Sequence, residues 1–324
     1  MKAILCTRPG TPDDLELADV PEPVAAAGEA VVRIAAVGLN FFDTLIIAGK
    51  YQMKPALPFS PGGEFAGVIE SVGTGVSGLA SGDRVLGYTT YGALRERLAA
   101  PAEKLVKLKA DLDLERAAGL AITYGTAIHA LADRARLQRG ETLAVLGAAG
   151  GVGIAAVELG KLMGARVIAC ASSDDKLTFA RKHGADAVVN YAGEDLRDAL
   201  KRLGGEHGID VIFDPIGGPY SEAALRAIAW KGRHLVVGFA AGEIPKLPLN
   251  LTLLKGCDVL GVYFGDWVRR EPAAYRAHLD QLARGASEGK LSCHVDRVYP
   301  LAETAAALKS LAARKAMGKV IVRP

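Results

Sequence analysis

The pattern of apolar positions changes part-way along the chain, near residue 114. Before that point, short runs of β-branched and apolar residues, such as residues 30–37 and 65–72, are separated by clusters of Gly and Pro. The runs predict strands, and the clusters predict the turns between them. A short apolar stretch over residues 40–48 predicts one brief helix. The first part of the chain is therefore expected to be rich in β-structure.

The second part alternates between helix-like and strand-like patterns. Apolar residues recur at helical spacing over residues 115–131. Further helices are predicted at residues 153–163 and 176–183, and strands at residues 143–146, 166–171, 187–189, 211–213 and 234–237. Short apolar strands with helices between them are typical of a parallel sheet that is covered on both faces. This pattern predicts a doubly wound α/β domain.

The C-terminal segment, residues 266–324, contains two helical patterns and a final strand-like run at residues 320–322. It is small for an independent domain, so we expect it to return to the β-rich domain and complete it. The predicted domains are residues 1–119 completed by residues 263–324, and residues 120–262 between them.

Composition narrows the function classes. The chain has 324 residues, which suits two domains, and its 50% hydrophobic and 23% charged content argues against disorder. A net charge of +3 with no basic run argues against a nucleic-acid partner. The four cysteines form no CxxC pair, so neither a zinc knuckle nor a CxxC redox centre is expected. No apolar run is long enough to span a membrane and no signal peptide is evident, so the expected location is cytoplasmic.

A glycine-rich turn follows the predicted strand at residues 143–146 and opens a helix. It is a displaced form of the dinucleotide-binding fingerprint, whose glycines let the backbone approach a pyrophosphate at a helix N-terminus. The alternative is a turn whose glycines serve only close helix–strand packing. The residues predicted to contact the nucleotide are Gly147, Ala149, Gly150, Gly151, Val152 and Gly153.

The end of the next predicted strand indicates the cofactor. Domains that prefer NAD place Asp or Glu there to hold the ribose 2′-OH. Here the strand ends in small and hydroxylic residues that include Ser172, and Lys176 follows one helical turn later. Hydroxyls and an ammonium favour a 2′-phosphate, so we expect NADPH. Asp174 and Asp175 are expected to point to solvent from the helix start, and the alternative for Lys176 is a solvated helix lysine.

Motifs with a recognisable pattern occur along essentially the whole chain. They are VGLNFFD at residues 37–43, GKY at 49–51, PFSPGGEFAGVI at 58–69, SGDRV at 81–85, the turn at 147–153, NY at 190–191, FDPIGG at 213–218 and GKV at 318–320. Together they resemble the zinc-independent quinone oxidoreductases of the medium-chain dehydrogenase/reductase superfamily. The resemblance implies a GroES-like β-rich catalytic domain plus a Rossmann domain, with NADPH bound in the cleft between them. It also implies a dimer or tetramer, and residues 256–263 resemble an edge strand that pairs across a two-fold axis.

The resemblance assigns further contacts to the cofactor. The positions that match the family's 2′-phosphate site are Ser172, Lys176, Tyr191 and Arg314, and those expected near the nicotinamide end are Thr123, Gly238 and Phe239. Gly238 and Phe239 also follow a predicted strand, at the carboxyl edge where such sheets bind ligands. The alternative for Tyr191 is a half-buried tyrosine at a strand end. The alternative for Thr123 is a buried threonine that bonds back to its own helical turn.

The zinc ligands of related dehydrogenases are missing. Zinc-dependent relatives place a Cys early in the chain and a Gly-His-Glu further on, and the matching positions here are Gly38 and Gly63, so that only Glu64 remains. Residues 86–92, where a structural zinc lobe would lie, contain no Cys. Because a catalytic zinc needs three protein ligands, no metal is expected and alcohol dehydrogenation is disfavoured. Glu64 is expected to be a structural carboxylate.

Reduction of a quinone or an activated enone needs orientation and a few polar donors more than a strong acid. By resemblance, Asn40, Tyr51 and Asp43 line the nicotinamide end of the cleft. Asn40 and Asp43 have N-cap-to-N3 spacing, so the alternative is that both only cap a short helix. The alternative for Tyr51 is a plain wall residue. His129 is expected in the core, and no Ser/His/Asp pairing is visible, so hydrolysis is not supported.

These observations are interpreted as an NADPH-dependent quinone reductase that acts on a small-molecule quinone or enone as a homodimer. A 2-enoyl thioester reductase of the acryloyl-CoA type is an alternative, because its hydride geometry is the same. A non-enzymatic NADPH-binding or RNA-binding protein is an alternative from another class. The small net charge argues against the RNA-binding form of this alternative.

Overall fold

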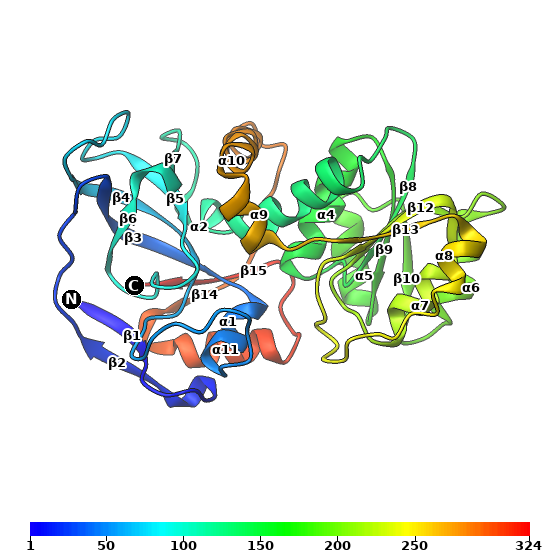
Figure 1. Cartoon of the computed structure of the whole chain (residues 1–324), viewed down its shortest axis with the longest axis horizontal. Coiled ribbons are helices and arrows are strands. Elements are labelled where there is room, and N and C mark those ends of the chain that lie inside the picture. The colour runs from blue at the N-terminus through cyan, green and yellow to red at the C-terminus, as the bar shows by residue number, and fades with distance from the viewer. The chain divides into compact units, whose positions relative to one another are not determined.

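The protein is described by a computed structural model that covers residues 1–324. Its internal contacts divide the chain into two units. The first unit comprises Met1–Thr123 and Glu271–Pro324, and the second comprises Tyr124–Arg270. In Figure 1 the first unit runs from blue to cyan and then from orange to red, and the second is green to yellow. The C-terminal segment therefore belongs to the unit that the N-terminus begins.

A seven-stranded, largely antiparallel sheet forms the core of the first unit. Its strands are β3 (Glu29–Leu39), β4 (Glu64–Val72), β5 (Arg84–Tyr88), β6 (Arg97–Pro101), β7 (Leu105–Lys107), β14 (Val295–Pro300) and β15 (Lys319–Arg323). The order is β14-β15-β3-β4-β5-β7, and β6 pairs with β3. A separate two-stranded sheet contains β1 (Lys2–Cys6) and β2 (Leu15–Asp19). The strands predicted at residues 30–37 and 65–72 are thereby confirmed.

The helices of the first unit are short except for one. They are α1 (Phe41–Ile47), α2 (Leu114–Ala117), α10 (Pro272–Ser287) and α11 (Thr304–Ala312). The C-terminal strand β15 pairs antiparallel with β3, with Val320 opposite Leu39, and lies between β3 and the edge strand β14, so the chain end is built into the sheet. Strand β14 was not predicted, because it is only half-buried and carries the charged residues Asp296 and Arg297.

The second unit is a six-stranded, all-parallel sheet with helices between its strands. The strands are β8 (Thr142–Leu146), β9 (Arg166–Ala171), β10 (Ala187–Asn190), β11 (Ile209–Asp214), β12 (Ile228–Val236) and β13 (Asp258–Gly261). The helices are α3 (Gly125–Ile128), α4 (Gly151–Leu162), α5 (Asp174–Lys182), α6 (Leu196–Gly204), α7 (Pro219–Leu225), α8 (Asn250–Lys255) and α9 (Phe264–Arg270). The order β10-β9-β8-β11-β12-β13 confirms the predicted doubly wound fold.

The strand order of this sheet reverses between β8 and β11. In open α/β sheets, ligands bind beyond the carboxyl ends of the strands at such a switch point. The turn after β8 and the loop after β11 therefore meet where the fold favours a ligand. His129 is buried in this unit and stacks on Trp267, with ring centroids 4.0 Å apart, which confirms its predicted place in the core.

The helix predicted over residues 115–131 is divided into shorter pieces. Helices α2 and α3 are separated by a π-helical turn, Leu120–Tyr124, and α3 continues into a second one, His129–Arg134. The Thr123 hydroxyl donates to the carbonyl of Gly119 at 2.6 Å, so a side chain competes with the regular backbone ladder there. No helix of the chain is both long and apolar enough to cross a membrane.

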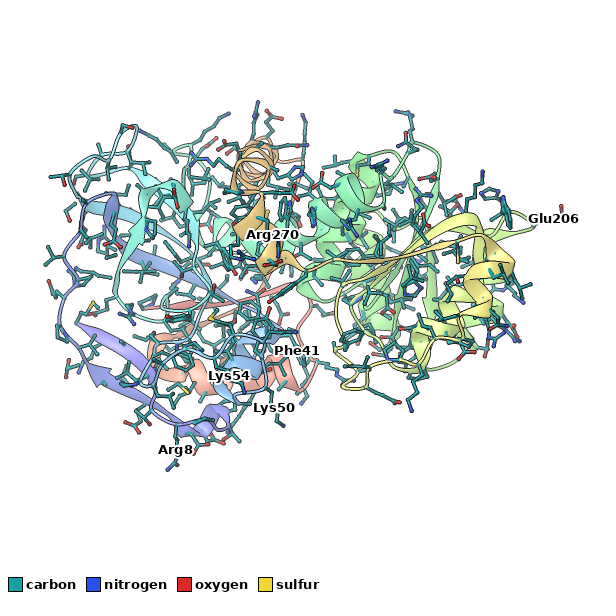
Figure 2. All side chains as sticks on the ribbon, in the orientation of Figure 1. Arg8, Phe41, Lys50, Lys54, Glu206 and Arg270 are labelled. Carbon is teal, nitrogen blue, oxygen red and sulfur yellow. The ribbon has the colours of Figure 1, made fainter.

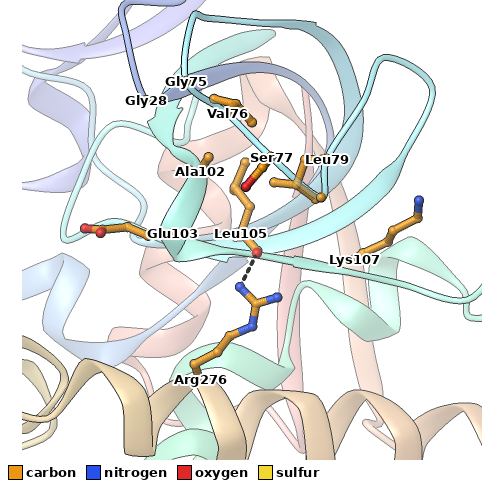
Figure 3. Close-up of a pocket in the computed structure, with 11 residues that line it drawn as sticks. Gly28, Gly75, Val76, Ser77, Leu79, Ala102, Glu103, Leu105, Lys107 and Arg276 are labelled. Carbon is orange, nitrogen blue, oxygen red and sulfur yellow. Dashed lines mark hydrogen bonds between the residues drawn. The ribbon is translucent and has the colours of Figure 1, made fainter.

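A surface pocket of about 370 Å³ lies in the first unit, between the loop at residues 75–79, the segment at 102–107 and helix α10. Figure 3 shows Arg276 of α10 reaching across to this segment, where it donates to the carbonyl of Leu105 at 2.8 Å. None of the predicted site residues lines this pocket. The hydrogen bond from Arg276 to Leu105 links helix α10 to strand β7.

Candidate functional site

The glycine-rich turn lies between β8 and α4, as the predicted fingerprint requires. Gly147 has a φ of +60°, which lets the chain reverse direction directly after the strand. The amide of Gly150 donates to the carbonyl of Gly147 at 3.0 Å, and Gly150 is the N-cap of α4. The first N–H groups of a helix have no intrahelical acceptor, so this end of α4 suits an anion.

Two glycines of the turn differ in what surrounds them. A Cβ at Gly153 would lie 2.2 Å from the carbonyl oxygen of Gly147 and 2.9 Å from the Cα of Ala148, both backbone atoms. A Cβ at Gly150 would meet nothing closer than 3.5 Å. Gly153 therefore serves the packing of helix on turn, whereas Gly150 leaves open space in front of the helix N-terminus. Gly153 therefore supports the packing interpretation of the turn, and Gly150 supports the ligand-binding interpretation.

The ends of β9 and β10 bring three predicted cofactor residues to the same edge. Ala171 and Asn190 are paired in the sheet, and Ser172 and Tyr191 follow them directly. Ser172 is exposed, and the Tyr191 ring lies 4.6 Å from the ring of Tyr220, half-buried against the core. Lys176 is half-buried on the first turns of α5.

The two acidic residues that complicate the choice of cofactor lie in the first turn of α5. Asp174 and Asp175 are both exposed, as expected. The Asp174 carboxylate accepts a hydrogen bond from Asn190 Nδ2 at 2.8 Å. Carboxylates near a helix N-terminus are stabilised by the helix dipole. No carboxylate occupies the strand end itself, where Ser172 stands.

Gly238 and Phe239 follow β12 at the same edge, next to the loop that follows β11. The amide of Gly238 lies 3.3 Å from the carbonyl oxygen of Asp214, and Phe239 is 37% exposed. A Cβ at Gly217 would lie 2.8 Å from Phe239 Cδ1, so the two loops touch. Gly238 and Phe239 therefore sit at the carboxyl edge of the sheet, close to the switch point.

A Ser/His/Asp cluster that the sequence spacing did not indicate is present here. Ser221 Oγ donates to Asp214 Oδ2 at 2.5 Å, and His234 Nε2 lies 3.2 Å from the same oxygen. Residues 7 and 20 positions from Asp214 were not recognisable as its partners from spacing alone. The cluster is not a hydrolytic triad, because Ser221 and His234 both bond to the Asp214 carboxylate and not to each other.

A second polar cluster lies in the first unit, at one end of three neighbouring strands. Lys319 begins β15, Glu64 begins β4, and Asn40 follows β3. Lys319 Nζ donates to Asn40 Oδ1 at 2.6 Å and forms an ion pair with Glu64. Asn40 Nδ2 donates to Glu64 Oε1 at 2.9 Å and to the carbonyl of Gly38 at 3.3 Å. All three side chains are buried, so this is a closed hydrogen-bonded triangle.

Asp43 joins this cluster from the first turn of α1. Its Oδ2 accepts a hydrogen bond from the backbone amide of Asn40 at 2.7 Å, which is the N3-to-N-cap bond of the predicted capping arrangement. Burial raises the pKa of Asp43 to about 7, although the Asn40 amide and the Lys319 charge act in the opposite direction. Asp43 is 1% exposed, so its carboxyl is part of the protein interior.

Glu64 also connects the cluster to the segment that carries Thr123. Its Oε2 accepts from the backbone amide of Ile122 at 2.8 Å. Thr123 is buried, and its hydroxyl bonds to Gly119 within the same turn, which is the geometry of the structural alternative. The Glu64 carboxylate thus links Asn40 to the backbone of Ile122, the residue before Thr123.

The remaining predicted residues are placed as follows. Tyr51 is half-buried, with its ring 5.5 Å from the ring of Phe42 on α1. Phe41, Lys50 and Lys54 mark this part of the chain in Figure 2. Arg314 is exposed in the first unit, after α11, with a φ of +55°. Ser172, Lys176 and Tyr191 belong to the second unit.

The residues around Glu64 do not fit a zinc ion. A Cβ at Gly38 would lie 2.2 Å from the carbonyl oxygen of Ala118, and 2.8 and 2.9 Å from carbons of Lys319 and Glu64. A Cys side chain has no room there. No group of three His, Cys, Asp or Glu anywhere in residues 1–324 could hold a metal ion. A Cys at position 38 is thus excluded by the Ala118 carbonyl oxygen together with the Lys319–Glu64 pair.

Lys319 was not recognised as a site residue from the sequence. It belongs to the Gly-Lys-Val motif, but its partners Asn40 and Glu64 are far away in the chain. One signal was available in the sequence, because Lys319 directly precedes the apolar run at residues 320–322. In the structure it opens strand β15, and its side chain is only 5% exposed. A lysine in such a position is rarely buried unless an acidic partner is present.

Two family models match different parts of the chain. Residues 26–110 match the family described as "Alcohol dehydrogenase GroES-like domain", and residues 151–284 match "Zinc-binding dehydrogenase". "Quinone oxidoreductase-like protein 2" of Mus musculus is 38% identical over 323 residues, which is 99% of this chain and 91% of the relative.

Two solved structures bear on the chemistry. The Escherichia coli quinone oxidoreductase complexed with NADPH aligns with a TM-score of 0.92 and 27% identity over 100% of both chains. The CurK enoyl reductase aligns with a TM-score of 0.90 and 26% identity over 99% of this chain and 98% of its own. With the glycine turn, the parallel sheet and the GroES-like sheet in place, the chain belongs to the quinone oxidoreductase-like family of the medium-chain dehydrogenase/reductase superfamily.

Proposed function

We propose that this protein is an NADPH-dependent reductase whose acceptor is a quinone or an activated enone. The observation that carries the proposal is the carboxyl edge of the parallel sheet, where the glycine turn lies beside a strand end that carries Ser172 instead of a carboxylate. Similarity to the Escherichia coli quinone oxidoreductase, solved with NADPH, supports the same cofactor. NADPH supplies a hydride when it is bound.

The residues at this edge fit a phosphorylated dinucleotide. The open space in front of Gly150 and the unpaired amides of the α4 N-terminus suit the pyrophosphate. Ser172 and Lys176 offer a hydroxyl and an ammonium to the 2′-phosphate, and the Tyr191 ring offers a face to the adenosine. Arg314, Thr123, Gly238 and Phe239 complete the proposed set of contacts. In this assignment Lys176 acts as a point charge, so its removal weakens the binding of NADPH more than the binding of NADH.

On the acceptor side, the chain's own groups orient the substrate oxygen. We assign Tyr51 and Asn40 to this oxygen, with Asn40 Nδ2 turning from its longer bond to Gly38 while keeping the shorter bond to Glu64. Donors held in place before the reaction stabilise developing negative charge without reorganisation. Asp43 fixes the start of α1 through Asn40, so we assign it a positioning role.

A 2-enoyl thioester is the second candidate substrate. The observation that favours it is the full-length similarity to the CurK enoyl reductase. The reacting atoms of an enoyl thioester and of an enone are alike, so both fit the same donors. The two substrates differ in the tail, which carries phosphates in a coenzyme A thioester.

The test follows oxidation of NADPH, by loss of its near-ultraviolet absorbance, with 1,4-benzoquinone and acryloyl-CoA in parallel, and repeats both with NADH. Faster turnover of the quinone with NADPH supports the proposal, and faster turnover of the thioester transfers the assignment to the enoyl reductase. Binding of NADPH with no turnover of either acceptor contradicts both and favours a non-enzymatic nucleotide-binding protein.

Two variants test the assignment of the cofactor. Ser172→Asp places a carboxylate at the strand end and is expected to lower NADPH affinity by roughly tenfold or more, with little loss for NADH. Lys176→Ala is expected to change the same ratio in the same direction. An unchanged preference in both variants would contradict the assignment of the 2′-phosphate site.

A further inference from the structure

The buried carboxylate of Asp214 is bonded on every side. Its Oδ1 accepts from the backbone amides of Ile216 and Gly217, each at 2.9 Å. Its Oδ2 accepts from Ser221 and lies 3.2 Å from His234 Nε2. Asp214 is 2% exposed, so none of these bonds is shared with solvent. The charge faces only its own donors and is not directed at a ligand.

The same residue binds the neighbouring loop through its backbone. The carbonyl oxygen of Asp214 accepts from the amide of Val237 at 2.9 Å and from that of Gly238 at 3.3 Å. The next carbonyls continue the connection, because Pro215 accepts from Ala240 and Ile216 accepts from Ala241. The loop after β11 and the loop after β12 are therefore held as one layer.

This layer touches the glycine turn. A Cβ at Gly147 would lie 2.5 Å from Ile216 Cδ1, so the Ile216 side chain packs directly on the turn. On its other side, Gly217 packs against Phe239. The two amides that Asp214 binds thus belong to the two residues that set the distance between the β11 loop, the glycine turn and Phe239.

His234 has no other polar partner that would explain its position. It is fully buried on β12, and its Nδ1 has no hydrogen-bond partner. Burial opposes ionisation of Asp214, but the bonds from His234, Ser221 and Gly217 outweigh it, so the pKa of Asp214 lies below its usual value. With Asp214 ionised, the His234 Nε2 atom carries the proton of this bond. Burying the unpartnered Nδ1 atom of His234 costs desolvation free energy, and the bond from Nε2 to Asp214 offsets that cost.

We propose that Asp214, held by His234 and Ser221, is a positioning residue that clamps the loops after β11 and β12 to the glycine turn and so sets the shape of the nucleotide-binding edge. The assignment of that edge to NADPH rests on the proposed function. The clamp itself rests on the hydrogen bonds within the second unit.

The test compares His234→Leu, which removes the donor, with His234→Gln, whose amide keeps one. His129→Leu is the matched control, because His129 is also buried in this unit but bonds to Asp133 and stacks on Trp267. For each variant, NADPH affinity is measured by titration, and backbone hydrogen exchange is measured on the nucleotide-free protein.

His234→Leu is expected to raise the Kd for NADPH by roughly tenfold and to accelerate exchange selectively at residues 216–217 and 237–241. His234→Gln is expected to recover most of both effects, and His129→Leu is expected to change neither. If His234→Leu does not fold, Ser221→Ala provides the same comparison with a smaller expected effect.

A wild-type Kd in His234→Leu, or accelerated exchange spread evenly over the sheet, would overturn the clamp. Absence of NADPH binding by the wild-type protein would instead refute the proposed function. The exchange measurement needs no nucleotide, so it still decides on the clamp in that case.

Discussion

The ammonium of Lys319 and the carboxylate of Glu64 form an ion pair that is almost wholly shielded from solvent, with side-chain exposures of 5% and 0%. Together with the carbonyl oxygen of Ala118, the pair fills the space that a Cys at position 38 would need. It also holds both ends of the Asn40 amide, since Asn40 accepts from Lys319 and donates to Glu64. One buried pair therefore fixes the orientation of a proposed site residue.

Removing one partner of this pair is expected to destabilise the protein strongly. Lys319→Met leaves the Glu64 carboxylate buried without its counter-charge, which typically costs about 3 kcal/mol or more. The double variant Lys319→Met/Glu64→Gln removes both charges of the pair and is expected to recover a large part of that loss. Urea unfolding of the single and double variants measures both effects.

The control is the exposed ion pair Lys2–Asp19, with side-chain exposures of 51% and 76%. Lys2→Met is expected to change the free energy of unfolding by less than about 1 kcal/mol. A Lys319→Met protein as stable as Lys2→Met would show that the buried pair does not contribute as described.

Asp43 is expected to make stability depend on pH near neutrality. Its pKa is about 7 in the folded protein and is ordinarily 3.8, so the folded state binds the proton more tightly than the unfolded state. Stability then falls as the pH rises from about 4 to about 7, because folding must take up a proton that the unfolded protein has lost. Asp43→Asn keeps an oxygen for the Asn40 amide but cannot ionise, so it is expected to flatten this decline.

Unfolding free energies of the wild type and of Asp43→Asn across this pH range test the prediction. Asp19→Asn serves as the control, since Asp19 is exposed and bonding to Lys2 lowers its pKa. Parallel pH profiles for the wild type and Asp43→Asn would assign the decline to other groups.

The glycine turn allows packing and ligand binding to be separated. Gly153→Ala places a Cβ against backbone atoms of Gly147 and Ala148. It is therefore expected to destabilise the protein by roughly 1–3 kcal/mol and to weaken the binding of NADPH. Gly150→Ala meets no atom closer than 3.5 Å, so it is expected to cost less than about 1 kcal/mol. Its Cβ nevertheless enters the space proposed for the pyrophosphate, and NADPH affinity is expected to fall at least tenfold.

Thermal unfolding without nucleotide and titration with NADPH measure the two effects independently. Wild-type NADPH affinity in Gly150→Ala would place the pyrophosphate elsewhere and leave the turn with a packing role alone.

The fold was accessible from the sequence because its signals are local. The apolar run before Gly147, the glycines themselves and the strand–helix alternation after them predict the parallel sheet, and the structure has it. The π-helical turns were not predictable from spacing, because they depend on local competition such as the bond from Thr123 to Gly119. Strand β14 was missed because half-buried, charged strands carry a weak periodic signal.

The candidate site was accessible only in part. Asn40, Asp43 and Glu64 were noticed singly, but the bond from Lys319 to Asn40 joins residues 279 positions apart. Nothing in linear spacing indicates such a contact, since it arises when the last strand of the chain pairs with β3 in the seven-stranded sheet. The same holds for Asp214 and His234, whose strands are neighbours only after the parallel sheet has formed.

The edge of the parallel sheet predicts self-association. Strand β13 pairs with β12 alone and so leaves its other side open. Near it, Trp230 and the α8 residues Leu253 and Leu254 are 66%, 79% and 68% exposed, an unusual set of large apolar side chains for a solvent-facing surface. We propose that two copies pair through β13 and cover these side chains.

Light scattering of the wild type is then expected to give the mass of two chains. Leu253→Lys/Leu254→Lys is expected to give the mass of one, because charged side chains oppose burial at such a surface. Leu162→Lys, at a residue on α4 that is 52% exposed, is the control and should remain a dimer. A wild-type protein with the mass of one chain would reject the pairing.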